Sequence, residues 1–171
     1  MDKYVELAKN TIDEYVKNKK IYSPSAEELT DEMARSQAGA FVSIHKNGDL
    51  RGCIGTIAPT QDNLALEIVS NAIAASTRDP RFPAITPDEL DALEINVDVL
   101  SEAEPIDSPA SLDVKRYGVI VEKGFKRGLL LPDLDGVDSV DLQIAIAKQK
   151  AGIDIFDTDV KLSRFEVIRH V

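Results

Sequence analysis

The sequence predicts an α+β fold with an antiparallel sheet, and three observations lead to this prediction. Strand-like runs come in pairs joined by short glycine-containing turns, which is typical of antiparallel hairpins. Helix-like segments follow these hairpins and do not alternate with single strands, as they would in a doubly wound parallel sheet. Both halves of the chain run in the order hairpin, helix, strand, which suggests an internal duplication.

The first 38 residues are predicted to hold a helix and then an irregular segment. Between residues 4 and 18, apolar side chains recur every three or four positions, so they form one stripe along a helix. Residues 20–38 are polar, and Ser25 with Glu28 has the spacing of a capping box for a short helix.

The first half, about residues 39–104, begins with a predicted hairpin around Asn47-Gly48, the strongest short-range hairpin signal. A three-residue loop over 46–48, with Gly48 in the left-handed conformation and a bulge, separates polar from apolar side chains best. We therefore expect two distinct faces. One carries Ala40, Val42, Ile44, Leu50 and Ile54; the other carries Ser43, His45, Arg51 and Cys53, with Phe41 beside Cys53.

The rest of the first half is predicted to form a helix, a short helical turn and a strand. The helix starts at Thr60 as its N-cap and ends before the prolines of residues 78–83. Thr86 and Glu89 form a second capping box with proline at the first helical position, so one turn of helix follows. Residues 94–100 alternate apolar and polar side chains, as a half-buried strand does.

The second half, about residues 112–171, repeats this order. Its predicted elements are strands at 117–121 and 125–131, a helix at 139–151 and a strand at 160–167. Gly152 suits the C-cap of the helix. The alternation of the last strand slips near Ser163-Arg164, which predicts a bulge. Residues 105–109, between the halves, are the only linker-like stretch.

Composition excludes several classes of protein. The 171 residues fit about one domain, and 20 basic against 30 acidic side chains give a net charge of −10. That charge argues against a nucleic-acid or anionic-membrane binder. A single cysteine, Cys53, excludes a disulfide-stapled scaffold. No signal peptide or membrane-spanning run is recognised, so we expect a cytoplasmic protein.

The usual sequence signatures of phosphate, dinucleotide, zinc and hydrolase sites are missing, so we expect no cofactor and no metal site. The acidic stretch 133–138 resembles part of a calcium loop, but it lacks the bidentate glutamate and the alternating ligands. We therefore expect a solvated turn there.

The strongest candidate for chemistry is the segment Leu50-Arg51-Gly52-Cys53-Ile54-Gly55-Thr56. Its glycines weaken a strand and expose the backbone to close approach. Cys53 is a candidate nucleophile if Arg51, with His45, lowers the pKa of the thiol. The alternative is that Cys53 serves as a small buried apolar side chain.

A second candidate is an arginine cluster of Arg51, Arg78 and Arg81. If the loop after the second helix folds over the first hairpin, these guanidinium groups converge on one pocket for a carboxylate or phosphate. The alternative is that the arginines hold the loop by pairing with Asp79, Asp88 or backbone carbonyls.

The run Leu50–Gly55 resembles the signature hexapeptide of the AMMECR family. Other blocks of that family are similar to Gly39–Ser43, Asp79–Pro83, Leu93–Val97 with Leu100-Ser101, Gly118–Val121, Arg127–Pro132 and Lys150–Gly152. The resemblance covers roughly residues 38–168. It implies one two-lobed α+β domain over residues 1–171, with a ligand-binding or catalytic hexapeptide. The chain has no tryptophan, which family members commonly carry in their C-terminal part, so we expect no ligand stacking there.

Bacterial and archaeal members of this family are often called AmmeMemoRadiSam system protein A, after a Memo-like protein and a radical S-adenosylmethionine protein. The resemblance therefore implies a stand-alone accessory domain that binds a partner segment or a small anionic ligand through Arg51–Thr56. Ser43, Arg78 and Arg81 would line the rim of that site. The alternative is an enzyme with Cys53 as nucleophile and Arg51 as electrostatic stabiliser.

Overall fold

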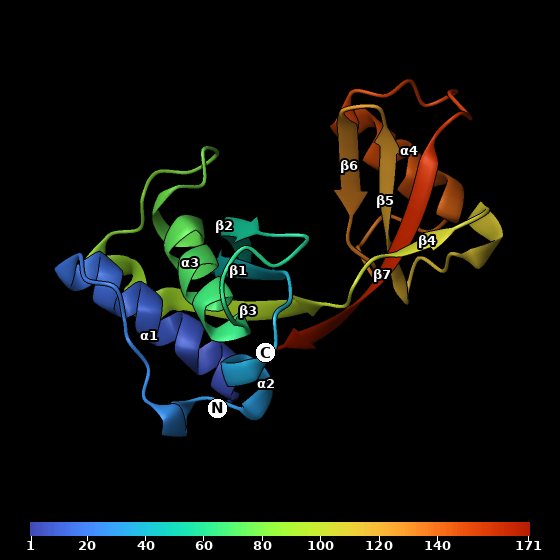
Figure 1. Ribbon diagram of the computed structural model, residues 1–171. Coiled ribbons are helices and arrows are strands. Elements are labelled where there is room, and N and C mark those ends of the chain that lie inside the picture. The colour runs from blue at the N-terminus through green and yellow to red at the C-terminus, as the bar shows by residue number, and fades with distance from the viewer. The chain divides into compact units, whose positions relative to one another are not determined.

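The computed structural model describes residues 1–171, which divide into two compact units. Unit 1 comprises Met1–Leu100 with the C-terminal residues Ile168–Val171, and unit 2 comprises Ser101–Val167. Each unit combines antiparallel strands with helices, so the predicted α+β class is confirmed (Figure 1). No helix is both long enough and apolar enough to cross a membrane.

The helical part of unit 1 begins at the N-terminus. Its elements are α1 (Lys3–Asn18), the 3-10 turn η1 (Ala26–Glu28), α2 (Asp31–Arg35), α3 (Leu64–Thr77) and the 3-10 helix η2 (Pro87–Ala92). The Asp2 carboxylate accepts the N–H groups of Tyr4 and Val5 and so caps α1. Both predicted capping boxes, at Ser25 and at Thr86, are confirmed.

The sheet of unit 1 has the antiparallel strand order β2-β1-β3. Its strands are β1 (Ala40–Lys46), β2 (Asp49–Gly55) and β3 (Leu93–Leu100). Helix α3 packs on β1 and β2, and α1 packs on α3 and β3 (Figure 1). The apolar side chains of α1, α3 and one sheet face form a single buried core. Two helices therefore cover that face of unit 1.

The β1–β2 hairpin has a shorter loop than the sequence suggested, so the prediction of a three-residue loop is wrong. Asn47 (φ 52°) and Gly48 (φ 84°) alone form the turn, both with the positive φ of a type I′ turn. The register shift falls instead between Ile44 and His45, opposite Arg51. As a result Leu50 pairs with His45 and does not join the buried face, which is a second correction.

Helix α3 starts later than predicted, because its N-cap is Asn63 and not Thr60. The Asn63 side chain accepts the N–H of Leu66, whereas the Thr60 hydroxyl donates to the buried carboxylate of Glu67. Glu67 also accepts the N–H groups of Thr60 and Gln61. Residues 60–62 thus form a loop before α3, and the Glu67 carboxylate in the first turn of α3 holds this loop in place.

Unit 2 contains the elements β4 (Glu104–Ile106), the 3-10 turn η3 (Pro109–Ser111), β5 (Tyr117–Lys123), β6 (Lys126–Leu130), α4 (Val140–Ala151) and β7 (Lys161–His170, of which the last three residues belong to unit 1). Strand β7 pairs with β4 on one side and with β5 on the other. The stretch 105–109 therefore belongs to ordered structure and is not a linker. Gly152 caps α4 in the left-handed conformation, as predicted.

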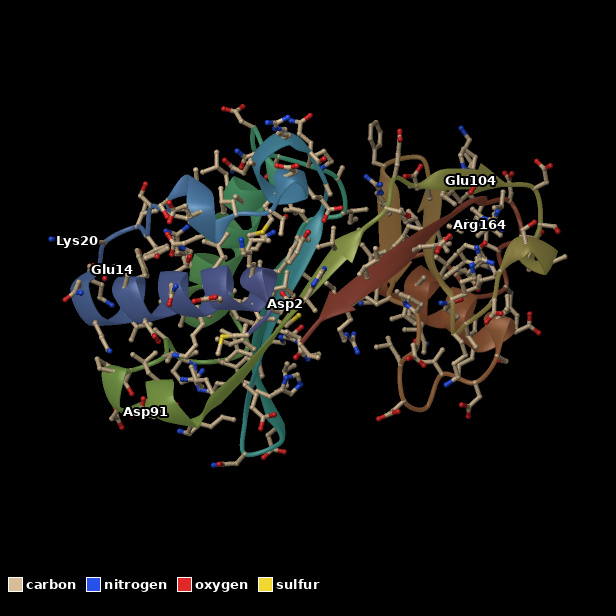
Figure 2. The ribbon with its side chains drawn as sticks, turned by 90° about the horizontal axis from the view of Figure 1, so that it is seen from below. Asp2, Glu14, Lys20, Asp91, Glu104 and Arg164 are labelled. Atoms are coloured by element: carbon tan, nitrogen blue, oxygen red, sulfur yellow. The ribbon has the colours of Figure 1, made fainter.

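The bulge predicted near Ser163-Arg164 is also wrong, because β7 keeps a constant register with β4 and with β5 there. The apolar alternation breaks for another reason. The Arg164 guanidinium forms an ion pair with Glu104 of β4 at 3.3 Å and lies 4.3 Å from the ring centroid of Tyr117 (Figure 2). A charged side chain thus occupies a position where the strand pattern calls for an apolar one.

One packing contact recurs in the two units. A Cβ atom on Gly52 of β2 would lie 2.2 Å from the carbonyl oxygen of Ala75 in α3. A Cβ atom on Gly128 of β6 would lie 2.2 Å from the carbonyl oxygen of Ala147 in α4. Each glycine follows an arginine on the return strand of its hairpin. The hairpin–helix–strand repeat therefore extends to the glycine that lets the helix backbone approach the strand.

The close approach at Gly52 makes the variant Gly52→Ala a sharp test of this packing. We expect it to lower the free energy of unfolding by about 3 kcal/mol, because the backbone of α3 must move away from β2. The control is Gly48→Asn, at an open turn position where asparagine tolerates positive φ. Urea unfolding of the three proteins measures the difference, and a loss of under about 0.5 kcal/mol for Gly52→Ala would contradict the packing.

Candidate functional site

The hexapeptide Leu50–Gly55 forms most of β2, the edge strand of the sheet in unit 1. One face of this sheet is covered by α1 and α3, and no helix of unit 1 covers the other. We call the second face the helix-free face. From the strand registers, it carries Phe41, Ser43, His45, Leu50, Cys53, Glu94, Asn96 and Asp98.

The Cys53 thiol lies on the helix-free face together with Ser43, as the sequence predicted. The predicted neighbour Phe41 is wrong, because Cys53 pairs directly with Ser43 and Phe41 pairs with Gly55. The Cys53 sulfur is 3.2 Å from the Ser43 hydroxyl oxygen. Burial raises the pKa of the Cys53 thiol, although the Ser43 hydrogen bond and the charge of Arg81 act in the opposite direction. The cation with the largest effect on this thiol is Arg81 and not Arg51, the residue that the sequence suggested. The thiolate needed for nucleophilic attack is therefore disfavoured at neutral pH.

The backbone of Cys53 is bound from the open edge of β2 by Asp79 and Arg81, which we call the edge clamp. The Asp79 carboxylate accepts the Cys53 N–H at 2.9 Å, and an Arg81 N–H lies 3.4 Å from the Cys53 carbonyl oxygen. Arg81 also donates to both oxygens of Asp79, at 3.1 and 2.8 Å. These bonds hold the pKa of the buried Asp79 carboxyl well below its ordinary value.

Arg51 is held at a different carboxylate. Its guanidinium donates to both oxygens of Glu89, each at 3.1 Å, and to the carbonyl oxygen of Pro83 at 2.7 Å. Lys46 adds a second ion pair to Glu89 at 3.0 Å. Mainly through the Arg51 hydrogen bonds, the pKa of Glu89 falls from 4.5 to about 2. Arg51 therefore fixes η2 and the preceding loop against the hairpin.

The three arginines do not form one cluster of free guanidinium groups. Arg51 and Arg81 are paired with different carboxylates, and Arg78 is exposed at the end of α3 without an ion pair. This arrangement matches the alternative in which arginines hold the loop after the helix. A small anion would have to compete with Glu89 for the half-buried Arg51 side chain, whereas the Arg81 side chain is 56% exposed beside Asp79.

The remaining residues of the predicted site support the strand itself. A Cβ atom on Gly55 would lie 2.2 Å from the ring of Phe41, so that ring fills the space of the missing side chain. Ile54 packs against the core of unit 1. The Thr56 hydroxyl donates to Glu67 at 3.1 Å and lies 3.2 Å from the side-chain nitrogen of Asn71. Only Leu50 has a largely exposed apolar side chain on the helix-free face.

Sequence reasoning missed Glu67, a buried carboxylate that organises the loop after β2. It noted Glu89 only as part of a capping box, although the same carboxylate also binds Arg51. The helix pattern places Glu67 opposite the apolar stripe and so predicts a solvent-facing side chain, but Glu67 is only 1% exposed. No group of three or more His, Cys, Asp or Glu side chains is arranged to hold a metal ion.

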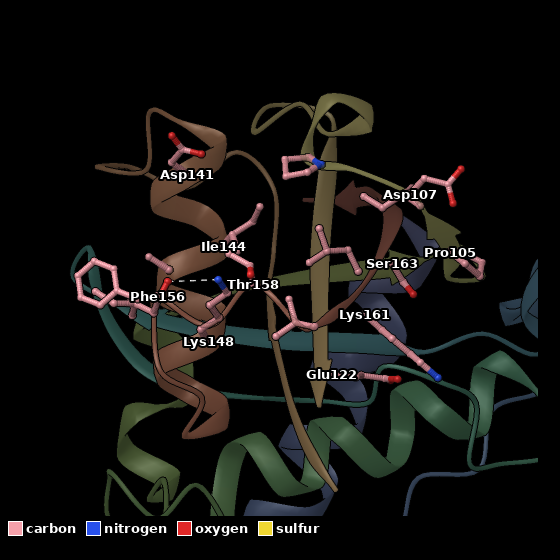
Figure 3. Close-up of a pocket in the computed structure, with 16 residues that line it drawn as sticks. Pro105, Asp107, Glu122, Asp141, Ile144, Lys148, Phe156, Thr158, Lys161 and Ser163 are labelled. Carbon is pink, nitrogen blue, oxygen red and sulfur yellow. Dashed lines mark hydrogen bonds between the residues drawn. The ribbon is translucent and has the colours of Figure 1, made fainter. Parts of the chain in front are cut away.

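Unit 2 contains a second candidate site that the sequence did not indicate, a groove with a volume of about 1030 Å³ (Figure 3). Helix α4 forms one side of the groove, and β7 with the β4 segment forms the other. We call it the unit 2 groove. Its lining mixes apolar side chains such as Ile144 and Leu162 with charged ones such as Asp107 and Asp141.

Comparisons with known proteins agree on one family. The family model described as AMMECR1 matches residues 5–170. A protein of Thermotoga maritima is 54% identical over 168 residues, which cover 98% of this chain and 96% of that protein. A protein of Clostridium acetobutylicum is 46% identical over 169 residues, 99% of this chain but 36% of the relative. The crystal structure of an uncharacterised protein from Pyrococcus horikoshii is similar with a TM-score of 0.88 and 32% identity, covering 97% of this chain and 88% of that one.

The depressed pKa of Glu89 predicts a pH dependence of stability. The stabilisation from its ion pairs is complete above the ordinary glutamate pKa of 4.5 and is lost as the pH falls through about 2. Between about pH 5 and about pH 2, wild type should lose roughly 2 kcal/mol more stability than Glu89→Gln, which has no carboxylate to protonate. Urea unfolding across this range measures both proteins.

The control for this experiment is Glu94→Gln, an exposed glutamate of β3 without an ion pair. It should follow the wild-type pH profile. Equal pH profiles for wild type and Glu89→Gln would show that the Arg51–Glu89 pair contributes nothing to stability.

Proposed function

The chain belongs to the AMMECR1 family, and on that premise we propose that it is an accessory binding domain whose working surface is the helix-free face of unit 1. Its proposed partners are a Memo-like protein and a radical S-adenosylmethionine protein, and its proposed compartment is the cytoplasm. The partners follow from the resemblance of the hexapeptide region to AmmeMemoRadiSam system protein A. A single free cysteine is compatible with a reducing compartment.

The observation that carries this proposal is that most residues of the hexapeptide are fixed by contacts within unit 1. Arg51 is bound to Glu89, and Gly52 and Gly55 are packed against α3 and Phe41. The edge clamp fixes the Cys53 backbone from outside the sheet. A strand fixed in this way is preorganised, so a partner that binds its outward side chains loses little entropy in ordering them.

A protein segment suits this surface better than a small anion. The helix-free face presents an exposed leucine, a half-buried thiol and hydroxyl, and a histidine, from Leu50, Cys53, Ser43 and His45. These groups offer apolar contact and neutral hydrogen bonds. Two of the three guanidinium groups of the predicted anion site, those of Arg51 and Arg81, are already paired with carboxylates.

The environment of Cys53 does not favour the alternative of an enzyme with this residue as nucleophile. Burial raises the pKa of the thiol, and its hydrogen-bond partner is the Ser43 hydroxyl, which is not a base at neutral pH. Arg51, the residue predicted to stabilise negative charge, is bound to Glu89. The structural argument therefore supports binding as the function of this strand.

Two exposed leucines of unit 1 allow a matched test of the proposed surface. Leu50 on the helix-free face is 39% exposed, and Leu66 on α3 is 43% exposed. The experiment measures binding of a purified Memo-like protein, and separately of a radical S-adenosylmethionine protein, from the same organism by biolayer interferometry. We expect Leu50→Glu to weaken binding about tenfold or more and Leu66→Glu to leave it unchanged, because both variants add one charge but only the first adds it to the proposed interface.

Two results would contradict the proposal. If wild type binds neither protein, the proposed partners are wrong. If it binds but Leu66→Glu weakens binding as much as Leu50→Glu, the helix-free face is not the specific contact surface.

A further inference from the structure

The two units repeat the same elements but cover their sheets differently. In unit 1, α3 packs on the hairpin strands β1 and β2, and α1 packs on the strand that follows, β3. In unit 2, α4 packs on the hairpin strands β5 and β6, and no helix of that unit packs on β7 to a comparable extent. Unit 2 therefore has a counterpart of α3 but no counterpart of α1.

The unit 2 groove lies where that missing helix would be, between α4 and β7. Its lining includes apolar side chains from both sides, namely Ile106 of β4, Leu162 of β7 and Ile144 of α4. Ile106 and Leu162 are only half-buried, whereas Ile95, Val97 and Val99 of β3 in unit 1 are at most 9% exposed beneath the helices. Unit 2 thus leaves open apolar surface that unit 1 covers with a helix.

One wall of the groove carries a large aromatic side chain, Phe156, that is exposed to solvent. Phe156 is 84% exposed, and Ile155 beside it is 39% exposed. The backbone of this segment makes a hydrogen bond to a side chain at each of the two residues. The Lys148 ammonium donates to the Ile155 carbonyl at 3.2 Å, drawn as a dashed line in Figure 3, and the Phe156 N–H donates to the Asp154 carboxylate at 2.9 Å. The hydrogen bonds hold the backbone that carries the exposed ring, so the ring is presented to solvent from a fixed position, where a partner can bury it.

We propose that the unit 2 groove binds an amphipathic helix of a partner protein, much as α1 covers β3 within unit 1. Helix α1 shows what such a helix requires, an apolar stripe at spacings of three and four residues that is buried on the sheet. A cavity of about 1030 Å³ accommodates the side chains of such a stripe. The site is separate from the helix-free face, so it stands independently of the function proposed above.

Charge at the groove indicates what kind of helix it binds. Asp107 and Asp141 lie on opposite sides of one end of the groove, and both are exposed and without an ion pair (Figure 3). Lys148 is buried and engaged with Ile155, so Lys161 is the one exposed cation among the lining residues. A partner helix with lysine or arginine at one end therefore complements the unpaired carboxylates.

The probe for this site is a fluorescein-labelled 18-residue peptide, designed as an amphipathic helix with one leucine stripe and two lysines near one end. Fluorescence anisotropy measures its binding to the full chain. Phe156→Ser is the test variant. Phe125→Ser is its control, because Phe125 is fully exposed in the same unit but lies in the β5–β6 turn outside the groove. We expect saturable binding that Phe156→Ser weakens about tenfold and Phe125→Ser leaves unchanged.

Two further peptides test the helix and its charge. A peptide of the same composition with its leucine stripe broken should not bind, and a peptide with glutamate in place of lysine should bind about tenfold more weakly. Equal binding of the intact and broken stripes, or equal binding by both phenylalanine variants, would overturn the proposal. So would concentration-dependent dimerisation of the free chain that Phe156→Ser abolishes, since a second copy would then fill the groove.

Discussion

The edge clamp is the interaction on which the candidate site depends. Strand β2 is an edge strand, so the outward N–H and C=O groups of Cys53 have no strand to pair with. The Asp79 carboxylate accepts that N–H, and Arg81 binds the carboxylate while reaching the carbonyl. A carboxylate that is only 4% exposed is tolerated because it is both hydrogen-bonded and paired with a charge. The loop after α3 and the hexapeptide strand are therefore held together by one compact set of bonds.

The repeat of the hairpin–helix–strand order explains both what the units share and where they differ. Gly52 and Gly128 allow the same close contact between a return strand and a helix backbone. The difference is the extra helix α1, which covers β3 in unit 1 and has no counterpart on β7 in unit 2. Unit 1 thus presents a fixed strand of a sheet that two helices cover, and unit 2 presents an open groove. Two separate binding surfaces can arise from one repeated architecture in this way.

Much of the fold follows from local sequence patterns. Asn47-Gly48 placed the hairpin, and the capping boxes at Ser25 and Thr86 placed two short helical turns. Some errors were local, such as the N-cap at Asn63 and not Thr60, but others depended on distant residues. The bulge at Arg51 is stabilised by Glu89, which lies 38 residues further along the chain, and no strand pattern reveals such a partner. The unit 2 groove depends on which strand lacks a helix, which is a property of packing and not of any single segment.

The most direct test of the edge clamp is the hydrogen-exchange rate of the Cys53 backbone amide, measured by NMR in wild type and in Asp79→Ala. The Thr56 amide is the internal reference, because it donates to the Ala40 carbonyl within unit 1 and not to the clamp. The clamp predicts that Asp79→Ala speeds exchange at Cys53 about tenfold or more while Thr56 is unchanged. Unchanged exchange at Cys53, or an equal rise at both amides, would contradict the claim that Asp79 specifically fixes this strand.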